Sequence, residues 1–319
     1  MTTKVTSGIF RKTGMICTVA AAILFSACDK NDDKDGMPAN TITTVVVTDA
    51  NFSLLESALI HAGLTDALSG TGPFTVFAPD NAAFAAAGLE TEAKIKAVPA
   101  ETLKKILLYH VVPQKISSSQ IATASNVAVK TANDLTIYVT KNGNGVFVNG
   151  IPVKKADVSA SNGVIHVINS VLMPPAGNIV ETAAANPNFS LLVAAVTRAS
   201  QGSTNVAQVL SGEGPLTVFA PTNQAFINAG FANAAAIQAA DPAVLTSILT
   251  YHVVPGRIFS SDLSEGAKPA TANGGTVTIT LAGGARVKGN GNTTASVISP
   301  ANLLTTNGVI HVIDHVLLP

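Results

Sequence analysis

The spacing of apolar residues predicts a helix early in the chain. Between residues 52 and 64, Leu54, Leu55, Ala58 and Leu59 recur at the spacing of one helix face. A stripe of this kind is typical of an amphipathic helix that packs on a core. We therefore expect a helix over Phe52 to Leu64.

A helix start of a different kind occurs later in the chain. Asp241 and Pro242 form an N-cap residue followed by proline in the first helical turn, where the missing proline N–H has no intrahelical partner to lose. Leu245, Ile248 and Leu249 then supply the buried stripe. A corresponding stripe after Pro99 consists of Leu103, Ile106 and Leu107.

Other segments are short apolar runs rich in β-branched residues, and these predict strands. Phe74 to Ala78 is such a run and ends at a proline. Residues 135–148 and the segment beginning at 276–281 each predict a hairpin, because a glycine-containing turn follows the first β-rich stretch. Residues 163–168 and 308–313 predict two further strands. Helical patterns precede strand patterns twice along the chain, so the predicted fold class is α+β.

The chain contains one unit twice. Four sequence blocks recur in the same order, and the offset between copies changes only slightly, which indicates a duplication with small insertions. The blocks are NFSLL at 51–55 and 188–192, TVFAPDNAAF at 75–84 with TVFAPTNQAF at 217–226, YHVVP at 109–113 and 251–255, and NGVIHVI at 162–168 and 307–313. We expect two domains, residues 41–175 and 178–319, joined by a short proline-containing connection.

The N-terminus has the pattern of a targeting segment. Lys4, Arg11 and Lys12 precede an apolar run that is too short to span a bilayer, and small residues lead into Cys28. The segment resembles a bacterial lipobox, with Phe25 where leucine is usual. We therefore expect residues 1–27 to be a lipoprotein signal peptide and Cys28 to carry the lipid.

The residues after this cysteine predict a tether and a location. Cys17 would be lost with the signal peptide, so the mature chain would hold no second thiol for a disulfide or a thiolate metal site. Residues 28–40 are acidic and hydrophilic, as in a disordered spacer. We expect a membrane-anchored lipoprotein of the outer membrane that faces the cell exterior, with a periplasm-facing lipoprotein as the alternative.

Composition changes this picture in one respect. Charged residues make up 12% of the 319 residues, hydrophobic residues make up 47%, and the formal net charge is zero. The chain therefore lacks the basic field that attracts nucleic acid, and we expect no nucleic-acid partner.

The repeated blocks, in this order, resemble the fasciclin domain family, and the resemblance covers the chain from about Thr41 to Pro319 in two copies. It identifies the sequence as a tandem fasciclin-domain lipoprotein of bacterial type. What it implies is a wedge of two β-sheets with packed helices in each domain, adhesion through extracellular matrix or through surface proteins and polysaccharides, and no required cofactor.

The same resemblance singles out candidate binding residues. Tyr109-His110 and Tyr251-His252 match a tyrosine-histidine pair that has been linked in the family to adhesion. Asp157 occupies the position of an aspartate in a second adhesion motif. A competing interpretation is that each pair supports the fold, and the strongly apolar neighbouring residues favour it.

The second copy departs from the aspartate motif, since Asn302 stands where the first copy has Asp157. Asp80 is similarly replaced by Thr222, and both residue types can cap the turn after the preceding proline. His110, His252, His166 and His311 occupy repeated positions within apolar runs, where we expect half-buried rings bonded to backbone groups and no metal site.

Motifs that carry chemistry are missing from the sequence. It contains no GxSxG, HExxH or P-loop pattern, so we expect no catalytic residues and no enzyme activity. Adhesion is the predicted function. A binding module for a small apolar ligand and a periplasmic structural or stress protein are the alternatives.

Overall fold

The computed structural model describes residues 40–319. The predicted signal peptide, Cys28 and the predicted tether up to residue 39 lie outside the described residues.

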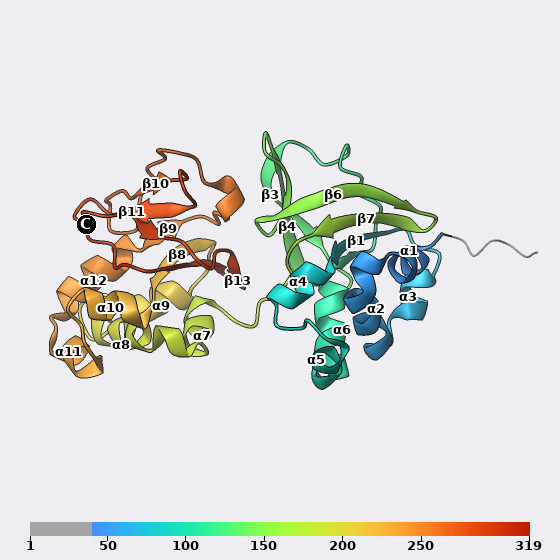
Figure 1. The fold of residues 1–319 in the computed structure, drawn as a ribbon. Helices are drawn as coiled ribbons and strands as arrows, with labels where there is room; N and C mark the ends of the chain where they lie inside the picture. The colour runs from blue at the N-terminus through green and yellow to red at the C-terminus, as the bar shows by residue number, and fades with distance from the viewer. Residues whose placement is uncertain (1–39) are drawn as a thin grey trace, which may run out of the picture. The chain divides into compact units, whose positions relative to one another are not determined.

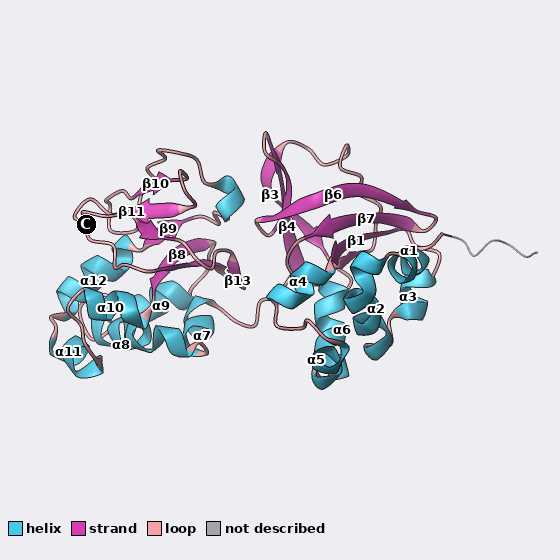
Figure 2. Ribbon diagram, in the orientation of Figure 1, coloured by secondary structure: helices cyan, strands magenta, loops and turns pink. Residues whose placement is uncertain are grey.

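The first repeat begins with helices and then turns to strands, as Figure 1 shows. Its helices gather on one side of its sheet (Figure 2). The helices are α1 (Ile42–Thr48), α2 (Ser53–His61), α3 (Thr65–Ser69), α4 (Asn81–Ala86), α5 (Glu92–Ala97) and α6 (Ala100–Tyr109), with a 3₁₀ turn η1 (Ala50–Phe52). The strands are β1 (Phe74–Pro79), β2 (Val111–Val112), β3 (Ala124–Lys130), β4 (Thr136–Asn142), β5 (Gly145–Val148), β6 (Ile151–Ala160) and β7 (Gly163–Ile168).

The second repeat follows the same order of elements. Its helices are α7 (Ile179–Ala184), α8 (Ser190–Ala199), α9 (Val206–Ser211), α10 (Asn223–Asn228), α11 (Ala234–Ala239) and α12 (Pro242–Tyr251), with the 3₁₀ turns η2 (Pro187–Phe189) and η3 (Ser260–Asp262). Its strands are β8 (Leu216–Pro221), β9 (Val253–Pro255), β10 (Thr278–Thr280), β11 (Arg286–Lys288), β12 (Ser296–Val297), β13 (Leu303–Thr305) and β14 (Gly308–Ile313). The predicted α+β class is confirmed.

The helix predicted over residues 52–64 is present but ends earlier. It starts with the 3₁₀ turn η1, continues as α2, and stops at His61. Gly63 follows with φ +65°, a left-handed conformation that glycine adopts without steric cost and that terminates the helix.

Side-chain caps fix where several helices start. Asp241 accepts a hydrogen bond from Ala243 N at 2.8 Å, as expected for the first turn of α12. Asp80 Oδ1 accepts from Ala83 N at 2.9 Å, and Thr222 accepts from the equivalent Ala225 N at 3.2 Å. The predicted exchange of one capping residue for another is confirmed at the starts of α4 and α10.

The strand predictions hold, and pairing places the signature strands in the interior of the sheets, with a neighbouring strand on either side. β1 pairs in parallel with β7, and β8 pairs in parallel with β14. β1 and β8 are buried from their second residue onward. The predicted hairpins correspond to β4 with β5 and to β10 with β11.

The two repeats differ in how their sheets connect. In the first repeat β6 pairs with β5 at its start and with β7 along the rest, which links all strands in the order β2-β1-β7-β6-β5-β4-β3. Register shifts near Lys155 let this long strand bend between the two partners. In the second repeat Pro300 stands at the place of Lys155, and the described strands form separate sheets, β13-β14-β8-β9 and β10-β11-β12. Proline cannot donate to a strand ladder, which accounts for the interruption.

Candidate functional site

The tyrosine of each predicted pair lies in the protein interior. Tyr109 and Tyr251 are both 0% exposed, at the last residue of α6 and of α12. The Tyr109 hydroxyl donates to Thr136 O at 2.9 Å and accepts from Asn149 Nδ2 at 3.1 Å. Burial raises the pKa of Tyr109 to about 12, because the phenolate would lose its hydration.

Tyr251 repeats this arrangement with different partners. Its hydroxyl donates to Thr276 O at 2.5 Å and accepts from Asn290 N at 3.0 Å. Each hydroxyl therefore ties the end of a helix to the start of the hairpin region, in β4 or just before β10, and to a loop. Both hydrogen-bonding capacities of the group are used within the fold.

The histidine of each pair is buried as deeply as the tyrosine. His110 and His252 are each 2% exposed, deeper than the half-buried state expected from sequence. His110 Nδ1 lies 2.8 Å from Ile106 O, and His110 Nε2 accepts from Leu172 N at 2.8 Å. An acceptor role for Nε2 requires the neutral ring with its proton on Nδ1.

His252 makes the same two contacts, with Ile248 O and Leu317 N, each at 2.8 Å. Burial lowers the pKa of both His110 and His252 to about 4, against a weaker upward effect of the backbone carbonyl that each ring contacts. Each ring thus joins the end of a helix to the segment that follows the last strand. This geometry favours the interpretation that the Tyr-His pairs support the fold.

Replacing Tyr109 by phenylalanine tests that interpretation. The change removes one hydroxyl and leaves Thr136 O and Asn149 Nδ2 without a partner, so the free energy of unfolding should fall by about 1–3 kcal/mol. Urea unfolding of the variant and of Tyr251→Phe, alongside attachment assays at a temperature where both remain folded, measures the two effects separately. Attachment lost in a variant of unchanged stability would make the tyrosine a contact residue.

Asp157 is the one residue of the predicted set with an exposed side chain. It has φ +59° and its carboxylate accepts hydrogen bonds from the backbone N–H and the hydroxyl of Ser118. The hydrogen bond from the Ser118 side chain holds the pKa of Asp157 below its usual value. The carboxylate therefore ties the loop around Ser118 to the bulge of β6 in the first repeat.

Asn302 does the same in the second repeat, despite the different residue type. It has φ +64°, its Oδ1 accepts from Ser260 N at 2.7 Å, and its Nδ2 donates to Ser260 Oγ at 2.7 Å. Aspartate and asparagine both tolerate the left-handed region, so either fits this backbone position. A shared structural role explains the exchange between the copies.

His166 and His311 lie directly behind Asp157 and Asn302, and both rings are 0% exposed. His166 Nδ1 accepts from Asp157 N at 3.2 Å, and His311 Nδ1 accepts from Asn302 N at 3.3 Å. On the other ring edge, His166 Nε2 lies 2.8 Å from Ile116 O, and His311 Nε2 lies 2.8 Å from Ile258 O. These two histidines are fully buried, where half-buried rings were expected, and each holds the backbone of Asp157 or Asn302 in place.

Two asparagines of similar importance were not singled out by the sequence analysis. Asn162 Oδ1 accepts from Ile42 N at 2.9 Å, and its Nδ2 donates to Leu68 O at 2.8 Å and Gly70 O at 2.7 Å. Asn307 makes the three equivalent contacts in the second repeat. The available signal was the identical asparagine that opens NGVIHVI in both copies.

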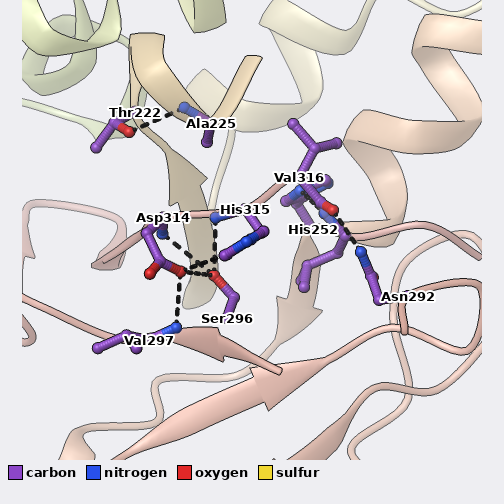
Figure 3. Close-up of polar contacts among 10 residues, drawn as sticks. Thr222, Ala225, His252, Asn292, Ser296, Val297, Asp314, His315 and Val316 are labelled. Carbon is purple, nitrogen blue, oxygen red and sulfur yellow. Dashed lines mark hydrogen bonds and ion pairs between the residues drawn. The ribbon is translucent and has the colours of Figure 1, made fainter. Parts of the chain in front are cut away.

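A serine, an aspartate and a histidine meet near the C-terminus, as Figure 3 shows. Ser296 Oγ donates to Asp314 Oδ1 at 2.7 Å, and His315 Nδ1 lies 2.8 Å from the same oxygen. A catalytic triad needs the histidine between serine and carboxylate, whereas here the carboxylate lies between the other two. The serine is 1% exposed and also accepts from the backbone N–H groups of Asp314 and His315, so the cluster fixes the chain end against β12.

Within residues 40–319, no group of three or more His, Cys, Asp or Glu side chains is placed to hold a metal ion. Over the same residues, no helix is both long enough and apolar enough to cross a membrane.

The fasciclin domain model matches the chain twice, over residues 50–174 and 187–319. The chain belongs to the fasciclin family. A Synechocystis protein is 46% identical to this fasciclin chain over 138 residues, which cover 43% of the chain and 75% of the relative. The transforming growth factor-beta-induced protein ig-h3 of Sus scrofa is 28% identical over 314 residues, which cover 95% of the chain.

The fasciclin chain spans less than half of the pig protein, 44% of its length. Among solved structures it is similar to a FAS1 domain pair from the insect cell adhesion molecule fasciclin I, with 20% identity and a TM-score of 0.42. That match covers 87% of this chain and 96% of the solved one.

Proposed function

We propose that this fasciclin protein is a cell-surface or envelope lipoprotein that mediates adhesion to extracellular matrix, to a polymer or to other cells. The observation that carries the proposal is the presence of two fasciclin domains on one chain, since the general role of the family is adhesion or binding.

The arrangement of side chains also favours binding over catalysis. The tyrosines and histidines of the signature blocks are engaged with backbone groups inside each repeat, and Ser296 donates to the carboxylate of Asp314 rather than to a histidine ring. What remains for a partner is the polar, weakly charged outer surface. Because charged residues make up only 12% of the chain, attachment should depend weakly on salt concentration.

Two similar domains on one chain suit a repetitive partner. Once one domain is bound, the other samples the same polymer at a high effective concentration, which strengthens attachment without any new contact. A matrix protein or a polysaccharide offers such repeated sites. A lipid on Cys28 would hold both domains at the membrane, and more than one acyl chain would make that attachment stable.

Cells that display the protein should attach to matrix-coated or polysaccharide-coated surfaces several-fold better than cells without the gene. The physical reason is that two domains on one chain can bind the repeated sites of such a surface together. Cys28→Ser should release the protein from the membrane and reduce cell attachment to the level of the deletion strain. The soluble form, residues 40–319, should bind the same coated surface on its own. Cell counting, membrane fractionation and surface plasmon resonance measure these three effects.

Protease treatment of intact cells is the control for location. Resistance of the protein to protease, together with unchanged attachment on every substrate, would contradict the adhesion proposal and favour a periplasmic structural or stress role. A small apolar ligand that copurifies with the protein, together with unchanged attachment on every substrate, would favour the ligand-binding alternative.

A further inference from the structure

An apolar cavity lies in the second repeat between helices α7, α8 and α9 and the strands beneath them. Its volume is about 80 Å³, and its walls include Ala183, Leu192, Val196, Leu210 and Val218. The equivalent space in the first repeat has a volume of about 10 Å³. One water molecule needs about 10–15 Å³ in this measure, so the second repeat holds room for a group of several carbon atoms.

Two substitutions between the repeats account for the larger space. The NFSLL block aligns Leu59 of α2 with Val196 of α8, and the starts of α1 and α7 align Val46 with Ala183. All four residues are buried and line the respective spaces. The second repeat thus has three fewer side-chain carbons at one point of the core, and a well-packed core collapses only partly around such a loss.

The outer rim of the cavity also becomes more apolar in the second repeat. Val193 replaces Glu56, and Ala207 replaces Thr65, at half-buried positions of the helices. Thr197, which stands where the first repeat has Ile60, is exposed at the rim, and its hydroxyl donates its one hydrogen to Val193 O at 2.8 Å.

The polar side chain deepest in the cavity wall has no hydrogen bond to offer. His252 lines the cavity, but its two ring nitrogens already contact Ile248 O and Leu317 N. Water in such a space would lack the polar partners that ordered water needs. The chemistry of the walls therefore selects a hydrocarbon group without donors or acceptors.

We propose that the second repeat binds a hydrocarbon group, such as the end of an alkyl chain, in this cavity, and that the first repeat does not. The cavity is lined by residues of the second repeat alone, and the inference does not depend on the proposed adhesion. Ala183 and Val196 are the residues that make the cavity deep enough.

The test uses n-hexane as the probe and methyl NMR of the full chain carrying Cys28→Ser, so that no detergent competes for the site. We expect saturable shifts confined to methyl groups of the second repeat, including those of Leu192, Val196 and Val218. The variant Ala183→Val/Val196→Leu restores the first repeat's residues and should weaken hexane binding at least tenfold. The same variant should raise the Tm by several degrees, because added methyl groups fill the void.

The reciprocal variant, Val46→Ala/Leu59→Val, is the matched control and should create hexane-dependent shifts in the first repeat. If the filled double variant does not fold, Val196→Leu alone, which restores a single methylene, should still weaken binding. Shifts that do not saturate, or equal binding by the wild-type and filled proteins, would overturn the proposal.

Titration with decanoate in solution and with phosphatidylcholine vesicles distinguishes a free amphiphile from a membrane lipid as the source of the alkyl chain. Shifts at the cavity with either one support the site. Binding of hexane but of neither lipid probe would overturn the assignment to an alkyl chain.

Discussion

Acidification from pH 7 to pH 4.5 is expected to reduce the free energy of unfolding of each repeat by about 2–3 kcal/mol, through one buried histidine in each. The residues are His110 and His252, whose pKa in the folded protein is about 4 against an ordinary value of 6.5. Burial also lowers the pKa of His311, which adds to the loss in the second repeat.

The direction follows from which state takes up protons. Below pH 6.5 the unfolded chain protonates these histidines, whereas the folded protein keeps them neutral because Nε2 must accept from Leu172 N or Leu317 N. The unfolded state is then favoured by about 1.4 kcal/mol per pH unit for each histidine. The stability that the two neutral histidines give the folded protein is therefore fully present above pH 6.5. It is lost progressively as the pH falls toward 4.

Urea unfolding at half-unit steps from pH 7 to pH 4.5 measures the slope. The control is His110→Gln, which should lower stability at neutral pH but flatten the pH dependence of the first repeat over this range. The hydrogen-bonded carboxylates have lowered pKa values and protonate at lower pH, so their effect is separable. A stability that is unchanged between pH 6.5 and pH 4.5 would contradict burial of the neutral rings.

Removing the side chain of Asn162 is expected to have an effect of similar size. Asn162→Ala leaves Ile42 N, Leu68 O and Gly70 O without their partner, at a site where the asparagine is 7% exposed. Each buried unsatisfied group costs about 1–3 kcal/mol, and partial relaxation brings the expected total to about 3–5 kcal/mol. Thermal and urea unfolding of the first repeat measures the loss.

Two matched variants locate the origin of this loss. Asn162→Asp keeps the oxygen that accepts from Ile42 N but loses both donors, so its effect should be intermediate. Asn307→Ala should cost less than Asn162→Ala, because Asn307 is only half-buried and water reaches its contact with Gly212 O. A loss below 1 kcal/mol in Asn162→Ala would show that these contacts do not hold α1 and α3 against the sheet.

Much of the fold was predictable from short stretches of sequence. The Asp241-Pro242 start of α12, the capping exchange of Asp80 and Thr222, and the duplication were read from residue types and spacing alone. Such signals are local, because a cap involves residues within one turn and a strand pattern repeats every two residues. The predicted helix end at Leu64 was wrong by three residues. Ala62 has a high helical propensity and so extends the apparent helix, whereas Gly63 in its left-handed conformation ends α2 at His61.

The candidate site was less predictable. The family resemblance singled out Tyr109 and His110, and their apolar neighbours favoured a place in the core without naming the atoms that they contact. Only the packed structure places both side chains in the interior and pairs each polar atom with a backbone group.

Local sequence signals therefore sufficed to predict the α+β class, the two copies, and the caps and strands that build them. The tertiary structure decided which side chains are buried, why Asn162 serves Ile42 across 120 residues of chain, and where Ala183 and Val196 leave a space. Those outcomes depend on which surfaces of separate elements meet. A hydrogen bond or a cavity between distant segments is set by three-dimensional packing and leaves no periodic trace in the chain.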